Sequence, residues 1–547
     1  MLLALTTTAT RPSCRRIPHN FPRFASKLSP NSKPSSSSKK PRPRLAQPEK
    51  TEADQDAPPD RWNYNSSSLL EVDTKSQEQL ASYRLVDANE LEKCTKPPRE
   101  VKMLMRDWIE DSLYNPNYGY FPKQAVIFDT QNTTFDFESL RNSIEFQEEV
   151  SSRYAAYGAD KHYGPGRQIW HTPTELFKPW YGIAMAKCLV SEYLLKYFPY
   201  EDFVIYEIGA GNGTLAMNIL DYLRSNHPEV YDRTRYHIIE ISENLVELQR
   251  KKLASAHPCV KVVHKSIFRW EKKEPAPCFV LAMEVIDNFA HDMIRYDLKT
   301  LEPLQALVTI DDRGDFDLIY TPITDPLIAS FLKLRTRLAH PPPIPRLLRA
   351  APALLRAYSN LPFAPNLSTA EYIPTRLLSL LRTLRNHFPR HRLLLSDFSS
   401  IPDAIPGRNA PVVQTRFQNT TVPVTTVLVA HGYFDIFFPT DFERLRDMYE
   451  YTLAEPAAAA GARPTPLTGR AGPLALGADY FSSYHPSNRR RPVDGVLSAS
   501  GLPVGERKSS VFTHAQFLST YADLHRTRLK SGENPMLEFY QNVKFLF

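Results

Sequence analysis

The sequence has 547 residues, of which 42% are hydrophobic, and this is enough for a sizeable core and excludes a wholly disordered chain. Its 47 prolines against 19 glycines predict long proline-rich connections between folded segments. Five cysteines without a Cys-x-x-Cys pair argue against a disulfide scaffold and a thiolate zinc site, and we expect no metal. No apolar run approaches the roughly 20 residues of a membrane-spanning helix, so we expect no membrane span.

The net charge of +7 is concentrated at the amino terminus. The first 50 residues hold 11 Lys and Arg against one acid, Glu49, so the other 497 residues sum to −3. A nearly neutral body gives no electrostatic reason to expect a nucleic acid partner. The leader is rich in Arg, Ser and Thr, which is typical of a transit peptide. It predicts import into the mitochondrial matrix; a chloroplast address and a basic tail without an address are the alternatives.

The first part of the folded chain shows helical periodicity. We expect a transit peptide and disordered linker over residues 1–75 and a helical region over 85–200, in which apolar residues recur at helical spacing over 101–109. The segment 171–175 reads as a second helix entry. These patterns alone predict core packing rather than a site.

An alternating glycine motif follows a buried strand. The apolar run over 203–208 leads into Gly209, Gly211 and Gly213, and helical spacing resumes over 215–223. Glycines are needed where the backbone turns sharply and approaches a ligand closely. The pattern predicts a strand, a cofactor-binding loop and a helix.

Two residues beside the loop bear on which cofactor it binds. A dinucleotide fingerprint would need Gly or Ala at 214, where this chain has Thr214. Glu207 would also place a second anion beside a pyrophosphate. Both residues disfavour a dinucleotide-binding oxidoreductase and favour a cofactor without phosphate. S-adenosyl-L-methionine fits, because its ammonium and sulfonium groups are attracted to acids.

Acidic residues also follow two further predicted strands. The strand over 236–241 carries Glu240 near its end, where a carboxylate can accept the hydroxyls of a ribose. The apolar strand expected over 279–289 carries Glu284, Asp287 and Asn288 at its carboxyl end. Polar residues at this edge of a parallel sheet commonly line a site.

Three phrases together resemble the MidA-like family of class I S-adenosyl-L-methionine-dependent methyltransferases: EIGAGNGTL at 207–215, IIEISENLVELQ at 238–249 and AMEVIDNF at 282–289. A segment at 427–437 is similar to the family's closing segment. The resemblance implies an α/β fold, with a class I methyltransferase (Rossmann-like) sheet, an added helical N-terminal region, and a cap and insertions. We expect the core over 201–450, a flexible insertion over 453–510 and a returning core segment over 511–547.

The resemblance also implies roles for particular residues. The expected cofactor-binding residues are Glu207, Gly209, Gly211, Gly213 and Glu240. The expected catalytic residues are Glu284 and Asp287, whose carboxylates would hold a guanidinium. As a hypothesis, an aromatic turn at Tyr118, Tyr120 and Phe121 walls a groove for a protein substrate.

The mitochondrial members of this family are protein arginine methyltransferases and assembly factors of respiratory complex I. The expected function is therefore S-adenosyl-L-methionine-dependent arginine N-methylation of a complex I subunit during assembly. The stretches that would face the substrate depart from the family pattern, which motivates an alternative: a non-catalytic assembly or scaffold protein that keeps the methyltransferase fold.

Overall fold

The computed structural model describes residues 82–123, 126–127, 134–159, 169–170, 172–345, 351–359, 366–402, 404–417, 420–454 and 509–547. The chain divides into two units, residues 1–66 and 67–547, and everything below concerns the second. The segment expected over 1–75 as transit peptide and linker lies outside the described residues, as does nearly all of the insertion expected over 453–510.

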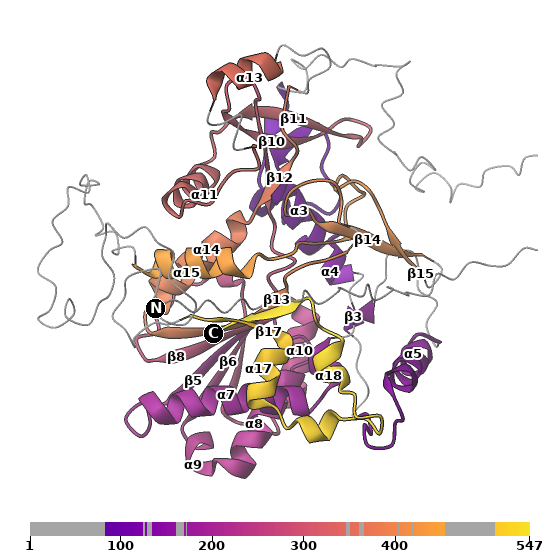
Figure 1. The fold of residues 1–547 in the computed structure, drawn as a ribbon, viewed down its shortest axis with the longest axis vertical. Coiled ribbons are helices and arrows are strands. Elements are labelled where there is room, and N and C mark those ends of the chain that lie inside the picture. Colours follow the sequence, from indigo (N-terminus) through magenta and orange to yellow (C-terminus); the bar gives the residue numbers. More distant parts are fainter. Residues whose placement is uncertain are drawn as a thin grey trace, which may run out of the picture. The chain divides into compact units, whose positions relative to one another are not determined.

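A seven-stranded sheet lies at the centre of the second unit (Figure 1). Its order is β7-β6-β5-β8-β13-β18-β17, with parallel pairing from β7 to β13 and β18 antiparallel to both of its neighbours. This order, with one reversed strand near the edge, is that of a class I methyltransferase sheet and confirms the expected fold class. The strands are β5 (Phe203–Ile208), β6 (Thr234–Glu240), β7 (Val260–His264), β8 (Cys278–Met283), β13 (His391–Phe398), β17 (Val511–Thr513) and β18 (Val543–Leu546).

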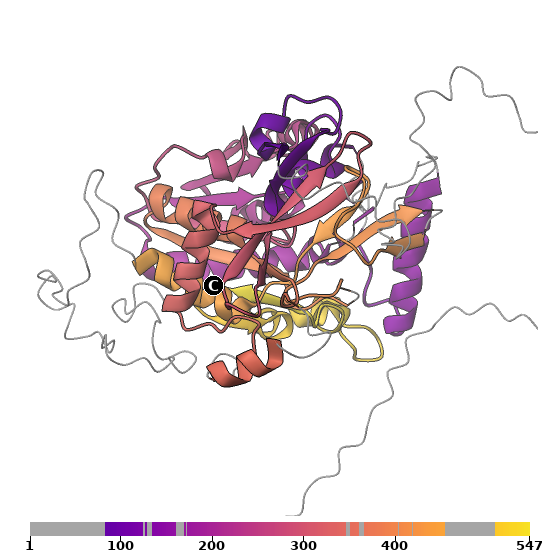
Figure 2. The ribbon, with the colours of Figure 1, turned by 90° about the horizontal axis from the view of Figure 1, so that it is seen from above.

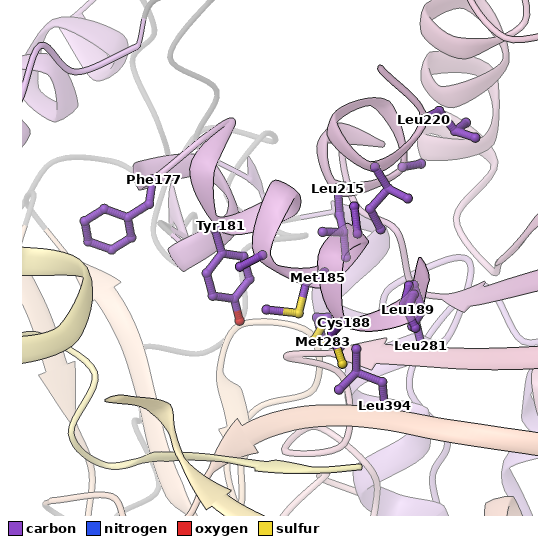
Figure 3. Close-up of a cluster of buried hydrophobic side chains, with 14 of the residues drawn as sticks. Phe177, Tyr181, Met185, Cys188, Leu189, Leu215, Leu220, Leu281, Met283 and Leu394 are labelled. Carbon is purple, nitrogen blue, oxygen red and sulfur yellow. The ribbon is translucent and has the colours of Figure 1, made fainter. Parts of the chain in front are cut away.

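Helices cover both faces of this sheet, which is why β5 and β8 are buried along their whole length. One face carries α7 (Trp180–Lys196), α8 (Thr214–Asn226) and α17 (His514–Tyr521), and the other carries α14 (Thr375–His387) and α15 (Phe442–Ala454) (Figure 1). Figure 3 shows how α7 packs, with Met185, Cys188 and Leu189 set against Leu281, Met283 and Leu394 of the strands. The glycine loop between β5 and α8 is thereby held on a rigid frame.

A second, six-stranded sheet contains strands from before and after the first half of the core. It consists of β1 (Arg84–Leu85), β2 (Val101–Leu104), β9 (Asp292–Tyr296), β10 (Pro303–Ile310), β11 (Phe316–Pro322) and β12 (Glu371–Ile373). Its β9, β10 and β11 pair in antiparallel fashion. They form a separate sheet rather than an extension of the first.

The helix expected from residue 101 begins later. Residues 101–104 form β2, which pairs antiparallel with β10, and only α3 (Met105–Tyr114) is helical. Figure 2 shows this indigo segment beside the salmon strands of the same sheet. The spacing of apolar residues fits both structures, and the free edge of β10 decides between them by supplying hydrogen-bond partners for residues 101–104.

The remaining elements connect or flank these layers. A three-stranded sheet has the order β15-β14-β16. In the part of the chain that the structure describes, no helix combines the length and apolar character that a membrane crossing requires. The further elements are α2 (Ala88–Leu91), α4 (Tyr120–Lys123), β3 (Val126–Ile127), α5 (Ser143–Ala159), β4 (Ile169–Trp170), α6 (Pro173–Leu176), α9 (Pro228–Tyr231), α10 (Glu243–Leu253), α11 (Pro326–Arg337), α13 (Pro352–Ser359), β14 (Val412–Phe417), β15 (Thr420–Pro423), β16 (Asp435–Phe437) and α18 (Pro535–Glu538), with 3₁₀ turns at Ile267–Arg269 and Leu524–Thr527.

Candidate functional site

The glycine loop joins β5 to α8 at the carboxyl edge of the seven-stranded sheet. Gly209, Gly211 and Gly213 all have positive φ, at 66°, 53° and 72°, a conformation that strains any residue with a Cβ. A Cβ on Gly209 would stand 3.0 Å from Val285, and one on Gly213 would stand 3.0 Å from Leu253. The loop therefore needs glycine both for its turn and for its close packing.

Glu240 lies at the end of β6, beside this loop. Its Oε1 accepts the backbone N–H groups of Ile241 at 2.8 Å and Ser242 at 2.9 Å. Burial raises the pKa of Glu240, while these hydrogen bonds oppose the rise. The structure therefore brings the expected ribose-binding carboxylate to the edge where the glycine loop turns.

Gln249 of α10 connects the loop and the acid, and the sequence analysis missed it. Its Nε2 donates to the carbonyl oxygen of Gly211 at 2.8 Å and to Oε2 of Glu240 at 3.2 Å. Its Oε1 is buried and has no hydrogen-bond partner among the described residues. A polar Gln on the buried face of α10, with Val246 and Leu253, is the signal that could have found it.

Glu207 is buried within β5. The hydroxyl of Tyr236 donates to its Oε2 at 2.8 Å. Burial raises the pKa of Glu207 to about 7, the hydrogen bond from Tyr236 lowers it, and the charge of Glu240 adds to the rise. The two expected acids of the cofactor loop are thus close enough to act on each other.

A segment before the core also reaches the glycine loop. Glu175 of α6 is buried, and its Oε1 accepts the hydroxyl of Thr214 at 2.7 Å and the side-chain amide of Asn212 at 3.2 Å. Its Oε2 accepts from Lys178 at 3.2 Å. The sequence analysis gave this segment no role; a buried carboxylate in the first turn of a helix is its only local signal.

The turn that follows β8 holds the two expected catalytic acids, Glu284 and Asp287, and is fixed by a third. Oδ2 of Asp397, at the end of β13, accepts the backbone N–H groups of Val285, Ile286 and Asp287 at 3.1, 2.9 and 3.1 Å. Burial raises the pKa of Asp397 to about 7 despite these bonds. We call residues 284–288 the acidic turn.

Glu284 begins the acidic turn in a left-handed conformation, with φ of 55°. Burial raises the pKa of its carboxyl well above the usual range, and the charges of Asp397 and Glu175 add to the rise. The charge of Glu284 in turn raises the pKa of Tyr181 on α7 and of Tyr540 near the C-terminus, where burial is the larger cause. Glu175 of α6 and Tyr181 of α7 are therefore part of the electrostatic surroundings of Glu284; Figure 3 shows Tyr181 on α7.

Asp287 lies in the same acidic turn, beside β16. Burial raises its pKa well above the usual range, and the charges of Asp397, Asp435 and Glu284 add to this. The side-chain amide of Asn288 donates to Oδ1 of Asp435 at 3.1 Å. Burial raises the pKa of Asp435 to about 8. The sequence analysis did not single out Asp435, which lies 148 positions beyond Asp287 in the chain.

The aromatic turn is only partly near these acids. Tyr118 and Tyr120 are buried, and the hydroxyl of Tyr118 donates to Asp111 at 2.8 Å, so the hypothesis that they wall a groove is wrong. Phe121 is half-buried and stacks on Tyr114, with ring centroids 5.1 Å apart. The hydroxyl of Tyr114 donates to the carbonyl oxygen of Asn288 at 3.1 Å, so this pair does reach the acidic turn.

The chemistry of this edge fits S-adenosyl-L-methionine. The unpartnered Oε1 of Gln249 and the carboxylate of Glu240 are acceptors for the hydroxyls of a ribose. Carboxylates at 207, 240 and 284 favour a ligand with positive charge and disfavour a phosphate. The sheet and this edge together define a class I methyltransferase.

Comparison with known proteins gives the family. Residues 184–458, half of the chain, match the family described as putative S-adenosyl-L-methionine-dependent methyltransferase. The chain belongs to this family, and its cofactor is S-adenosyl-L-methionine.

Several relatives can be named. The chain is similar to the "Protein arginine methyltransferase NDUFAF7 homolog, mitochondrial" of Schizosaccharomyces pombe (strain 972 / ATCC 24843), with 26% identity over 336 residues, 58% of this chain and 67% of the relative. Among solved structures, it is similar to a protein from Burkholderia thailandensis bound to S-adenosyl-homocysteine, with 15% identity, a TM-score of 0.40, and coverage of 69% of this chain and 76% of that one. A native crystal structure from the same organism has 14% identity and a TM-score of 0.38, over 69% and 75% of the two chains.

Proposed function

We propose that this protein methylates arginine side chains of another protein, a subunit of respiratory complex I during assembly, in the mitochondrial matrix. The fission yeast relative, named as a mitochondrial protein arginine methyltransferase, supports the acceptor and the organelle. The leader of residues 1–50, with its charge of +10, supports import.

The acidic turn beside the glycine loop is the observation that supports a positively charged acceptor. It holds Glu284 and Asp287, and Asp397 and Asp435 lie against it. In the part of the chain that the structure describes, no Lys, Arg or His forms an ion pair with Glu284, Asp287 or Asp435. Carboxylates gathered in this way attract a positively charged group, and an arginine guanidinium is charged at any physiological pH.

Different residues of the chain would bind the cofactor and the acceptor in such a reaction. When bound, S-adenosyl-L-methionine supplies a methyl group on a positively charged sulfur. The glycine loop, Gln249 and Glu240 would hold the nucleoside, and Glu284 and Asp287 would orient the guanidinium. A nitrogen that gains the methyl group loses a proton, and one of these two carboxylates accepts that proton before it passes to water.

The test is methyl transfer to mitochondrial proteins. Wild type and Glu284→Ala are incubated with isotopically labelled S-adenosyl-L-methionine and a mitochondrial extract, and methylarginine is located by mass spectrometry. We expect a labelled complex I subunit with wild type and a rate lower by about 100-fold with Glu284→Ala. Glu247→Ala, an exposed acid on α10, is the matched control and should retain the wild-type rate.

Calorimetric binding of S-adenosyl-homocysteine gives the experiment its second readout. Both variants should bind it like wild type, since neither change removes a residue of the glycine loop. Tight binding by wild type with no methyl mark on any protein would contradict the proposal and favour the alternative, a non-catalytic assembly protein.

A further inference from the structure

Two carboxylates from segments far apart in the chain each keep a buried oxygen without a hydrogen-bond partner among the described residues. They are Oδ1 of Asp287, in the acidic turn, and Oδ2 of Asp435, on β16. The side chains are well buried, because Asp287 is 7% exposed and Asp435 is 0% exposed. Across the residues that the structure describes, neither carboxylate has a cationic partner.

Hydrogen bonds join the segments that carry these two acids. The amide of Asn288 donates to Oδ1 of Asp435 and to the carbonyl oxygen of Ile436, both at 3.1 Å. The backbone N–H of Phe438 donates to the carbonyl oxygen of Asp287 at 2.8 Å. Asn288, next to Asp287 in the chain, thus bonds to Asp435 directly, and these contacts place the two acids side by side. They are held in a fixed relationship by the backbone on both sides.

A buried pair of carboxylates destabilises the fold when no ligand is bound to it. A buried acceptor that lacks a donor loses its interaction with water and gains nothing in return, and two neighbouring carboxylates repel each other when ionised. A neutral hydrogen-bond donor would satisfy the open carboxylate oxygens but would leave their negative charge uncompensated. A guanidinium would do both, because it carries one positive charge and five N–H donors in a planar fork.

Glu284, the first residue of the acidic turn, has a different set of neighbours. Its charge acts on Tyr181 and Tyr540, and it is itself acted on by Glu175, which is bonded to the glycine loop. Asp287 and Asp435 instead lie near Tyr114, whose pKa is raised by burial and by their charges. Among the described residues, hydrogen bonds tie Asp287 and its neighbour Asn288, but not Glu284, to the segment around β16 that carries Asp435.

We propose that Asp287 and Asp435 form a carboxylate pair that binds the guanidinium of the acceptor arginine, and that Asp435 is a substrate-binding residue. The choice of arginine rests on the proposed function, whereas the pairing of the two acids rests on their open oxygens. Asn288 acts as a positioning residue, because its amide holds Asp435 against the turn.

The test is the binding of small cationic probes to the full chain saturated with S-adenosyl-homocysteine. N-acetyl-arginine methylamide is titrated into wild type, Asp287→Asn, Asp435→Asn and the exposed control Asp232→Asn. We expect each of the first two variants to weaken binding by about 10-fold or more, because each removes a charge-assisted hydrogen bond. The control should bind like wild type.

Two related probes define what the pair recognises. N-acetyl-citrulline methylamide has a similar shape but no charge, and it should bind at least 10-fold more weakly than the arginine probe. N-acetyl-lysine methylamide carries an ammonium, and it should also bind more weakly than the arginine probe. Equal affinity for the lysine probe would overturn the assignment to a guanidinium.

Other outcomes separate this inference from the proposed function. If Asp435→Asn binds the arginine probe as tightly as wild type, the inference is overturned, even if wild type methylates a mitochondrial protein. The inference is also overturned if wild type binds neither the arginine probe nor the lysine probe. A wild type that binds the arginine probe through both acids but transfers no methyl group supports the inference and contradicts the proposed function. Melting temperatures verify folding, and should Asp435→Asn not fold, Asp287→Asn decides the result.

Discussion

Gln249 donates a side-chain amide hydrogen to the carbonyl oxygen of Gly211 at 2.8 Å. This bond ties α10 to the middle of the glycine loop, and the same nitrogen reaches Glu240 at 3.2 Å. The loop is therefore fixed from outside its own sequence, by a residue 38 positions away. The shape of the cofactor site depends on this bond as well as on the three glycines.

The first prediction concerns this bond. Gln249→Leu replaces the side-chain amide with an apolar group of similar size and leaves the Gly211 carbonyl and one oxygen of Glu240 without their donor. We expect affinity for S-adenosyl-homocysteine to fall by about 10-fold, the value of one hydrogen bond to a charged group. Isothermal titration calorimetry measures it. Glu247→Ala on the exposed face of the same helix is the control, and an equal loss there would contradict the explanation.

The second prediction concerns Gly211 itself. Its φ of 53° and its place in the loop mean that Gly211→Val both strains the backbone and adds a branched side chain at the cofactor. We expect no measurable binding of S-adenosyl-homocysteine and a protein that still folds. Gly532→Val is the matched control, because Gly532 also has positive φ but nothing lies within 4 Å of its added Cβ. Full cofactor affinity in Gly211→Val would show that the site has been placed wrongly.

The third prediction separates stability from activity at Glu284. This residue is strained by its φ of 55°, so Glu284→Gly should relieve about 1 kcal/mol of backbone strain and stabilise the fold. It should also lower the rate of methyl transfer by about 100-fold, as expected for Glu284→Ala, because the same carboxylate is lost. Urea denaturation and the transfer assay measure the two effects. Asn409→Gly, at φ of 50° outside the acidic turn, should stabilise the fold without loss of activity. Full activity in Glu284→Gly would exclude a catalytic role.

The fourth prediction is a pH dependence of stability. The pKa of Asp435 is about 8 in the folded chain, above its ordinary value of 3.8, so the folded state holds a proton that the unfolded state releases. The titration of Asp435 therefore lowers the free energy of unfolding progressively as pH rises from about 4 to about 8, by at most ~1.4 kcal/mol for each pH unit. Above about pH 8 the effect changes little.

Asp435→Asn removes this titration. Urea midpoints of wild type and variant should differ increasingly in favour of the variant between about pH 5 and about pH 8, and the difference should then level off. Loss of the Asp435 charge also lessens the rise in the pKa of Asp287, which adds to the difference in the same direction. Glu207, whose pKa is also raised, is common to both proteins and cancels in the comparison. The exposed Asp232→Asn serves as the control. A difference that does not change with pH would contradict the prediction.

Some features of the site could be read from the sequence because they are local. The alternation of Gly209, Gly211 and Gly213 after a buried strand specifies a turn with positive φ, and the structure has that turn. The expected positions of Glu240 and Glu284 at strand ends follow from the same logic, since the carboxyl ends of parallel strands meet at one edge. The fold class and the cofactor follow from these short-range patterns.

The tertiary structure decided which distant groups meet. Nothing local marks Asp397 as the acceptor for the acidic turn 111 residues away, or Asp435 as the neighbour of Asp287. Pairing with β10 likewise turned residues 101–104 from an expected helix into a strand. Short-range periodicity fixes how a segment can fold, whereas hydrogen-bond partners and buried charges depend on contacts between segments far apart in the chain, and only the packed structure supplies these.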